Sequence, residues 1–200
     1  MATVTLVIGM AVLDGVIANV ALPTIARALG ATPAASIWVV NAYNIAIVAS
    51  LLPLASLGEI LGYRRVYQAG VAVFTVASLV CAFSTSLPML IAARVVQGLG
   101  AAGIMSMNSA MVRFSYPQAM LGRGIGFNAI VVALASAAGP SIAAAILGVA
   151  DWPWLFAVNV PLGVAALAIG HFALPRVALS PRSFDIAAAA LNALTFAPLF

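Results

Sequence analysis

The sequence predicts an all-α membrane protein, and three observations lead to this fold class. The 200 residues are 65% hydrophobic and only 6% charged, whereas soluble domains carry roughly a quarter charged residues. Their mean hydropathy is +1.20. The apolar residues also form runs that are long enough to cross a bilayer as single helices, which takes about 20 residues. We therefore predict transmembrane helices that are joined by short loops.

Six apolar runs of spanning length follow one another along the chain. They predict helices near residues 3–24, 37–57, 66–84, 88–111, 125–148 and 154–174. We expect residues 1–174 to form one six-helix bundle, residues 175–184 a cytoplasmic linker, and residues 185–200 the start of a seventh helix. Because this last run is too short to span a bilayer, we expect the chain to be truncated.

The arginines predict how the helices are oriented in the membrane. A cytoplasmic N-terminus places six of them in cytoplasmic loops: Arg64, Arg65, Arg113, Arg123, Arg176 and Arg182. Only Arg27 then lies in an outer loop, and an excess of basic residues in cytoplasmic loops is what sets topology. We therefore expect a multi-pass protein of the plasma membrane with its N-terminus in the cytoplasm.

Two charged residues are predicted to lie inside the spans, Asp14 in the first helix and Arg94 in the fourth. A charge at the centre of a spanning helix costs about 2.5–3.5 kcal/mol on insertion scales, so such charges usually pair. The two depths differ by a helical turn or two, which the long arginine side chain covers. We expect an Asp14–Arg94 pair, which is either purely structural or a centre at which Asp14 binds and releases a proton.

The fourth predicted helix has one packing face and one polar face. Small residues recur at every fourth position, which lets another helix approach closely: Gly98, Ala102, Ser106 and Ala110. Gln97 and Asn108 share the face of Arg94. A polar face of a spanning helix points at protein or at a water-filled cavity. We therefore take Gln97 and Asn108 as candidates for a substrate cavity.

The second predicted helix adds two polar residues on one face, Asn41 and Asn44. They lie three residues apart and are therefore neighbours on the helix surface. Either they line a substrate cavity, for which we take them as candidates, or they bind this helix to its neighbours.

Several classes of function are not supported. The sequence shows no nucleophile with a base, no metal-ligand spacing and no phosphate-binding loop, so we predict neither an enzyme nor a cofactor or metal site. The arginines form no cluster or stripe of the kind that nucleic-acid binding requires. Cys81 lies inside an apolar run and has no second cysteine with which to form a disulfide.

A stretch between the second and third helices resembles the hallmark loop of the major facilitator superfamily, G-x-L-a-D-(R/K)-x-G-(R/K)-(R/K). The matching residues are Leu57, Gly62, Arg64 and Arg65, with Glu59 where Asp is usual. The departures are Ala55, Ile60 and Tyr63.

Four further stretches are similar to motifs of the same superfamily. Residues 94–102 fill every position of the fourth-helix motif R-x-x-Q-G-x-G-a-a, and residues 13–23 resemble l-D-x-T-i-v-N-v-A-L-P with Val16 for Thr. Gly139 and Pro140 stand where the antiporter motif G-P-x-x-G-G belongs, although alanines replace its closing glycines. Residues 152–163 resemble W-R-W-i-F-l-i-N-v-P-i-G. Together these motifs point to the fourteen-helix branch of drug:proton antiporters.

The resemblance implies an alternating-access transporter of a bacterial plasma membrane, of which this chain supplies the N-terminal six-helix bundle of the major facilitator fold. Its partners would be protons, a lipophilic or cationic drug, the lipid bilayer and the missing C-terminal half. Asp14 and Arg94 would form the proton-responsive centre. The gate on the cytoplasmic side would be held by Glu59, Gly62, Arg64 and Arg65, and the interface with the other half shaped by Gly139 and Pro140.

Two alternatives to proton-coupled multidrug efflux stay open. Within transport, the protein would move metabolites by symport or uniport. Outside transport, the chain would be a non-transporting membrane fragment or assembly partner, because half a transporter cannot enclose a substrate site.

Overall fold

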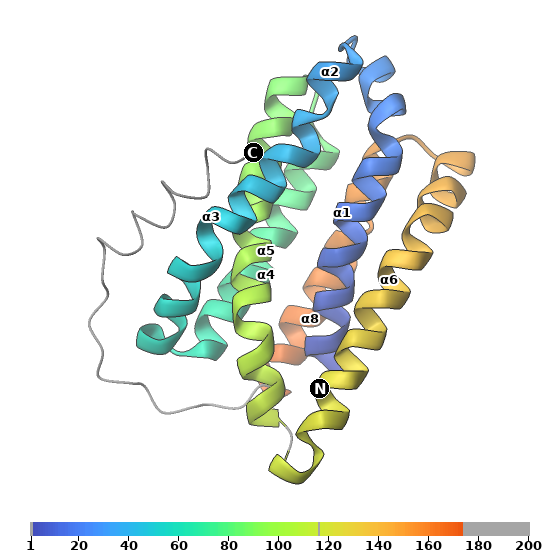
Figure 1. Cartoon of the computed structure of the whole chain (residues 1–200). Coiled ribbons are helices and arrows are strands. Elements are labelled where there is room, and N and C mark those ends of the chain that lie inside the picture. Colours follow the sequence, from blue (N-terminus) through green and yellow to red (C-terminus); the bar gives the residue numbers. More distant parts are fainter. Residues whose placement is uncertain (1, 116, 174–200) are drawn as a thin grey trace.

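The computed structural model describes residues 2–115 and 117–173, which fold into a bundle of helices (Figure 1). The helices are α1 (Ala2–Ala28), α2 (Pro33–Ser36), α3 (Trp38–Leu61), α4 (Tyr63–Ala82), α5 (Leu87–Ser115), the short 3-10 helix η1 (Gln118–Met120), α6 (Leu121–Val149), α7 (Pro153–Ala157) and α8 (Asn159–Ala173). No strand occurs in these two ranges. The predicted linker 175–184 and the predicted helix start 185–200 lie outside the described residues.

Within the described residues, six helical segments are long and apolar enough to cross a membrane, which confirms the predicted all-α fold class. They are Thr3–Ala28, Pro33–Leu61, Tyr63–Ala82, Leu87–Arg113, Gln118–Val149 and Pro153–Phe172. All six coincide with predicted helices, and five of their twelve ends differ from the predicted ends by three residues or more. The largest extension is at the start of the fifth span, where η1 and the first turn of α6 precede the apolar run.

The hallmark stretch between the second and third spans is helix rather than the predicted loop. α3 continues to Leu61, α4 begins at Tyr63, and Gly62 alone separates them. Gly62 has φ 98°, and its N–H donates to the Gly58 carbonyl at 3.0 Å. A positive φ suits glycine because it has no Cβ. One glycine therefore reverses the chain, and the residues on both sides of it remain helical.

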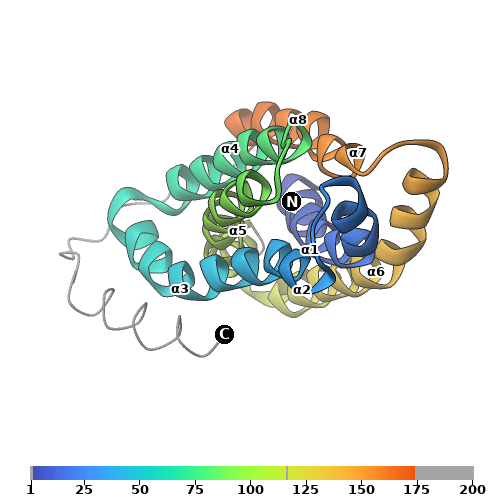
Figure 2. The ribbon, with the colours of Figure 1, turned by 90° about the horizontal axis from the view of Figure 1, so that it is seen from above.

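α1 and α5 occupy the middle of the bundle, between α4 and α8 on one side and α3 and α6 on the other (Figure 2). Burial agrees with this arrangement. In the most apolar 18-residue window, 61% of the α1 span and 56% of the α5 span is buried, against 11% for the second span and 17% for the fifth. The two predicted intramembrane charges therefore lie on the two central helices.

A polar layer crosses the bundle between two apolar clusters. The first cluster surrounds the N-terminal half of α1 and includes Val4, Val7, Ala11, Phe74, Ala101 and Met107. The second surrounds its C-terminal half and includes Ile17, Ile25, Cys81, Leu90 and Phe156. Asp14 lies between Ala11 and Ile17 on α1, and Arg94 lies between Leu90 and Ala101 on α5. The charges are therefore enclosed by apolar packing on both sides along the bundle axis.

Glycines bring α5 into backbone contact with α3 and α4. A Cβ added to Gly98 would lie 2.6 Å from the Tyr43 carbonyl oxygen of α3, which confirms the predicted close approach at that position. On another face of α5, a Cβ added to Gly100 would lie 2.5 Å from the Phe74 nitrogen and 2.8 Å from the Gly70 carbonyl oxygen of α4. Small residues allow such approach between membrane helices.

We expect Gly100→Ala to destabilise the bundle, because the added methyl group meets main-chain atoms of α4 that cannot rotate away. Overpacking of this kind costs roughly 1–3 kcal/mol, and sometimes more. Gly126→Ala on α6 is the matched control, since no atom lies within 4 Å of its added Cβ. Thermal unfolding of the two purified variants in detergent compares them directly. Equal melting temperatures would show that α4 and α5 are not packed as described.

Candidate functional site

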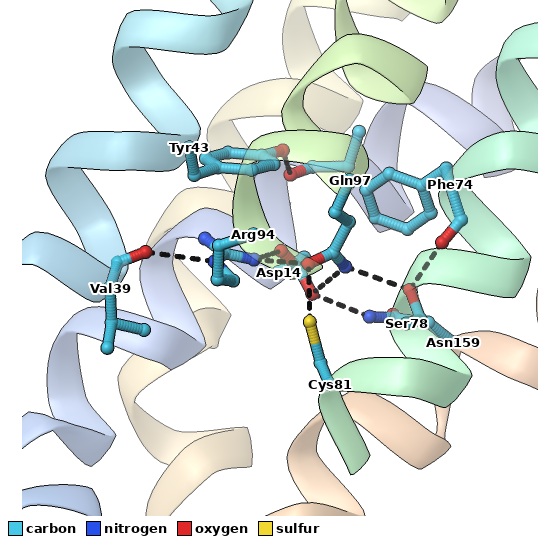
Figure 3. A network of polar contacts seen from close by, with 10 residues as sticks. Asp14, Val39, Tyr43, Phe74, Ser78, Cys81, Arg94, Gln97 and Asn159 are labelled. Carbon is cyan, nitrogen blue, oxygen red and sulfur yellow. Dashed lines mark hydrogen bonds and ion pairs between the residues drawn. The ribbon is translucent and has the colours of Figure 1, made fainter. Parts of the chain in front are cut away.

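The predicted charge pair forms in the polar layer. Arg94 Nη1 donates to Asp14 Oδ2, and the exposed fractions of the two side chains are 0% and 1% (Figure 3). Removing two charges from water is costly, and their attraction compensates only when hydrogen bonds satisfy the remaining donors and acceptors. The neighbours of the pair therefore decide whether it is tolerated.

Two amide side chains complete the environment of the carboxylate. Gln97 Nε2 donates to Asp14 Oδ1 at 2.9 Å, and Asn159 Nδ2 donates to the same oxygen at 2.7 Å. Gln97 is itself fixed, since its Nε2 donates to Ser78 Oγ at 2.8 Å and its Oε1 accepts from Arg94 Nη1 at 2.7 Å. Both Asp14 oxygens thus accept hydrogen bonds from protein donors, and side chains of α1, α4, α5 and α8 meet at one point.

The guanidinium of Arg94 is held from the side of α3. Its Nε donates to the Val39 carbonyl at 3.1 Å, and its central carbon lies 3.9 Å from the centroid of the Tyr43 ring. An aromatic face attracts a cation at this distance. Tyr43 is fixed in turn, because its hydroxyl donates to the Ala11 carbonyl at 3.2 Å. Of the three guanidinium nitrogens of Arg94, only Nη2 has no hydrogen-bond partner among the described residues.

The Asp14 carboxylate connects three helices. It accepts hydrogen bonds from Arg94 and Gln97 of α5 and from Asn159 of α8. The ion pair is therefore the centre of a buried polar network that joins α1 to α5 and α8.

The other candidates for a substrate cavity lie in different surroundings. Asn44 is exposed on α3 and Asn41 is half-buried on the same helix. Gln97 is fully buried within the network around Asp14, and Asn108 is 7% exposed with no hydrogen-bond partner for its Oδ1 among the described residues. The four residues therefore differ in burial and in hydrogen bonding, and their contact with a substrate stays a prediction.

The four predicted gate residues gather where α3 meets α4. Glu59 lies in the last turn of α3, Gly62 forms the reversal, and Arg64 and Arg65 lie in the first turn of α4. Arg64 Nη2 donates to the main-chain carbonyl of His171 near the end of α8. Arg65 is exposed. The side chain of Arg64 thus connects α4 with α8 within the described bundle.

The two residues of the predicted antiporter motif face different directions. Gly139 is buried, and a Cβ added to it would lie 2.5 Å from Val16 Cγ1 of α1. Pro140 is exposed on α6. Gly139 of α6 therefore packs inside this bundle against Val16, which is two residues after Asp14 on α1. Pro140 lies on the surface of the bundle.

Sequence reasoning found the charge pair and missed most of what surrounds it. Asn159, Ser78 and Tyr43 were not among the predicted site residues, although each is a polar side chain within an apolar run. The sequence offered one usable signal, since Asn159 is the asparagine of the motif at residues 152–163. In the described part of the chain, no group of three or more His, Cys, Asp or Glu side chains is placed to hold a metal ion.

Six membrane-spanning helices around a buried charge pair define a multi-pass membrane protein with an ionisable centre inside the bilayer. The model of the Major Facilitator Superfamily matches residues 4–195 of the sequence. The chain belongs to this superfamily.

Its relatives include transporters that are named for different functions. The chain is 60% identical over 200 residues to the uncharacterized transporter YebQ of Escherichia coli (strain K12), covering 98% of this chain and 44% of that protein. It is 36% identical over 179 residues to the riboflavin transporter RibZ of Clostridioides difficile (strain 630), covering 88% and 39%. It is 35% identical over 179 residues to the tetracenomycin C resistance and export protein of Streptomyces glaucescens, covering 88% and 33%. The chain thus spans less than half the length of these relatives.

A solved structure shows the same fold at low sequence identity. The bacterial homologue of the human lysosomal transporter Spinster, in an inward-facing and unoccupied conformation, matches with a TM-score of 0.68 and 15% identity. The match covers 93% of this chain and 45% of that chain. It supports the predicted architecture, an N-terminal six-helix bundle of the major facilitator fold.

Proposed function

We propose that the chain is the N-terminal half of a proton-coupled transporter that exports small lipophilic or cationic drugs in exchange for protons. The observation that carries the proposal is the Asp14–Arg94 pair, with both side chains fully buried at the level where the central helices meet. Ionisable residues inside a membrane protein are costly and commonly mark ion pathways and proton relays.

The pair provides a two-state switch. With Asp14 charged, Arg94 binds Asp14, Gln97 and the Val39 carbonyl and holds α1, α3 and α5 together. With Asp14 protonated, the cation loses its counter-charge, and the arrangement in which Arg94 finds other partners becomes favoured. A local charge change then shifts the population of two global conformations. Alternating access uses such a shift to expose a central site to one side of the membrane at a time.

The remaining predicted residues fit this scheme at the surface of the bundle. Asn41 and Asn44 would contact substrate from α3, which is largely exposed. The gate would form at the α3–α4 junction, through Glu59, Gly62, Arg64 and Arg65. Pro140, exposed on α6, would face the second half of the transporter, and Gly139 would set the distance between α6 and α1.

The orientation that we propose places the N-terminus in the cytoplasm of a bacterial cell. Successive spans alternate in direction, so the α3–α4 and α5–α6 junctions lie at the same end of the bundle as the N-terminus (Figure 1). These junctions carry Arg64, Arg65, Arg113 and Arg123. Arg27 lies at the opposite end, in the last turn of α1. This asymmetry follows the positive-inside rule.

The relatives support export of drugs and leave a second candidate. One relative is named as a tetracenomycin C resistance and export protein. The motif at residues 13–23 also resembles that of the drug:proton antiporter branch. The 36% identity to the riboflavin transporter RibZ favours, as the second candidate, a transporter of metabolites. The two candidates differ in substrate and in the direction in which protons move.

The test is proton movement in proteoliposomes that contain the complete product of the gene encoding this chain. Ethidium, a lipophilic cation, or riboflavin is added outside vesicles that hold a pH-sensitive dye. In antiport, ethidium entering down its gradient drives protons out, and the pH of the vesicle interior rises. Symport would lower the interior pH, and uniport would leave it unchanged.

We expect a rise in interior pH with ethidium and no response in vesicles without protein. A fall in interior pH with riboflavin would contradict drug antiport and support metabolite symport. The absence of any movement of either probe, from protein that is folded and inserted, would contradict proton-coupled transport of both.

A further inference from the structure

Besides its ion pair with Arg94, Asp14 accepts a short hydrogen bond from the side-chain amide of Asn159. Asn159 Nδ2 donates to Asp14 Oδ1 at 2.7 Å, and Asn159 is 4% exposed. Asn159 is the first residue of α8, which lies on the opposite side of the central helices from α3 (Figures 2 and 3). Arg94 binds the other carboxylate oxygen. The carboxylate is therefore held between α5, which donates to both of its oxygens through Arg94 and Gln97, and α8, which donates to Oδ1 through Asn159.

The hydrogen bond from Asn159 depends on the charge of Asp14. Hydrogen bonds to an ionised acceptor are roughly twice as strong as those between neutral groups. Gln97 Nε2 also donates to Oδ1, but it donates to Ser78 Oγ as well and remains satisfied when the carboxylate changes. Among the described residues, Asp14 is the one hydrogen-bond partner of Asn159 Nδ2. α8 is thus the element whose attachment to the network changes most with the charge of Asp14.

α8 is in turn fixed to α4 at two levels. A Cβ added to Gly163, one turn after Asn159, would lie 3.0 Å from Thr75 Cβ of α4. At the far end of α8, the His171 carbonyl accepts from Arg64 of α4. A displacement of Asn159 is therefore passed to α4 through direct packing. It reaches the α3–α4 junction, where the proposed gate residues lie.

We propose that Asn159 is a positioning residue, which holds the Asp14 carboxylate and makes α8 and α4 move together with its protonation state. This deepens the proposed function and rests on it. The other titratable or charged groups around Asp14 are Arg94 on α5, which binds it, Tyr43 on α3, whose ring packs against Arg94, and Cys81 on α4, which donates to Gln97. Asn159 differs from them because it carries no charge and does not titrate, so its effect on transport passes through Asp14.

The first test exchanges the two side chains in the complete gene product. Asp14→Asn removes the carboxylate, and the double variant Asp14→Asn/Asn159→Asp returns one carboxylate to the same contact, with the amide now on α1. We expect the double variant to move protons with ethidium at a rate at least about tenfold above that of Asp14→Asn alone, because the charge-assisted contact is restored. If Asn159 only fills space, the double variant will be no more active than Asp14→Asn.

The second test separates positioning from packing and needs no transport. Cys81 is fully buried and donates to Gln97 Oε1 at 3.5 Å, so its alkylation by N-ethylmaleimide reports opening of the network. We expect Asn159→Leu, which keeps the number and branching of the heavy atoms and loses the donor, to be alkylated at Cys81 about tenfold faster than the unaltered protein. Peptide mass spectrometry follows that residue alone. Gln118→Ala, which removes an exposed amide from η1, is the matched control.

The two tests also keep the proposals apart. If the unaltered protein moves neither ethidium nor riboflavin, the proposed function fails, and the alkylation of Cys81 still decides the role of Asn159. If transport is present but Asn159→Leu alters neither transport nor the protection of Cys81, the positioning role is overturned and the proposed function stands. Size-exclusion profiles exclude variants that do not fold.

Discussion

Asp14→Asn in the complete gene product is expected to abolish proton-coupled movement of ethidium while the protein still inserts and folds. The substitution keeps the shape of the side chain, and an amide oxygen still accepts from Gln97 and Asn159. It removes the group that binds the proton. It also fixes position 14 in a neutral state, so the switch between the two arrangements of Arg94 cannot be driven. The measurement is the rate of proton movement in proteoliposomes, normalised to the amount of reconstituted protein.

Asp151→Asn serves as the matched control for this result. Asp151 is an exposed acid in the connection between α6 and α7, outside the buried polar layer of the described bundle. Its loss should leave transport unchanged. Ethidium-driven proton movement that persists in Asp14→Asn would show that another group carries the proton.

Arg94→Met is expected to produce the largest loss of stability of any single change in the bundle. It leaves the Asp14 carboxylate buried without its counter-charge and removes the hydrogen bonds to Val39 and Gln97. Breaking one partner of a buried pair costs about 3–5 kcal/mol. Replacing both partners, as in Asp14→Leu/Arg94→Met, is often neutral or stabilising because no charge is left buried. The double variant should therefore be more stable than Arg94→Met alone, although it should not transport.

Thermal unfolding in detergent, followed by size-exclusion chromatography, compares these variants. Arg123→Met is the control, since Arg123 is exposed on α6 and its replacement should leave the melting temperature nearly unchanged. In the double variant Gln97 and Asn159 still lack the acceptor that Asp14 provided, so full recovery of the melting temperature is not expected. A double variant that is less stable than Arg94→Met would contradict the pairing of the two charges.

The number and order of the spans could be predicted because bilayer thickness fixes the length of an apolar helix. The ends of the spans could not, since polar residues do not stop a helix. Arg64 and Arg65 were expected in a loop and lie in the first turn of α4. What ends α3 is the positive φ of Gly62, and sequence alone does not distinguish that glycine from Gly58, which is helical.

The charge pair could be predicted because an isolated charge inside a membrane is too costly to remain unpaired. Its neutral partners could not, since serine, tyrosine and asparagine are tolerated in many places in a span. Asn159 lies 145 residues from Asp14 in sequence. Only the packing of α8 against α1 brings them together, and no periodicity within one helix encodes that contact.

The two apolar clusters on either side of the polar layer have a consequence for energy conversion. They leave Asp14 and Arg94 without exposed surface toward either end of the bundle. A proton moving along the bundle axis would cross packed hydrocarbon, which solvates ions poorly. In this conformation packed hydrocarbon therefore separates the charge pair from both ends of the described bundle. Under the proposed function, a proton would reach Asp14 only when the helices part.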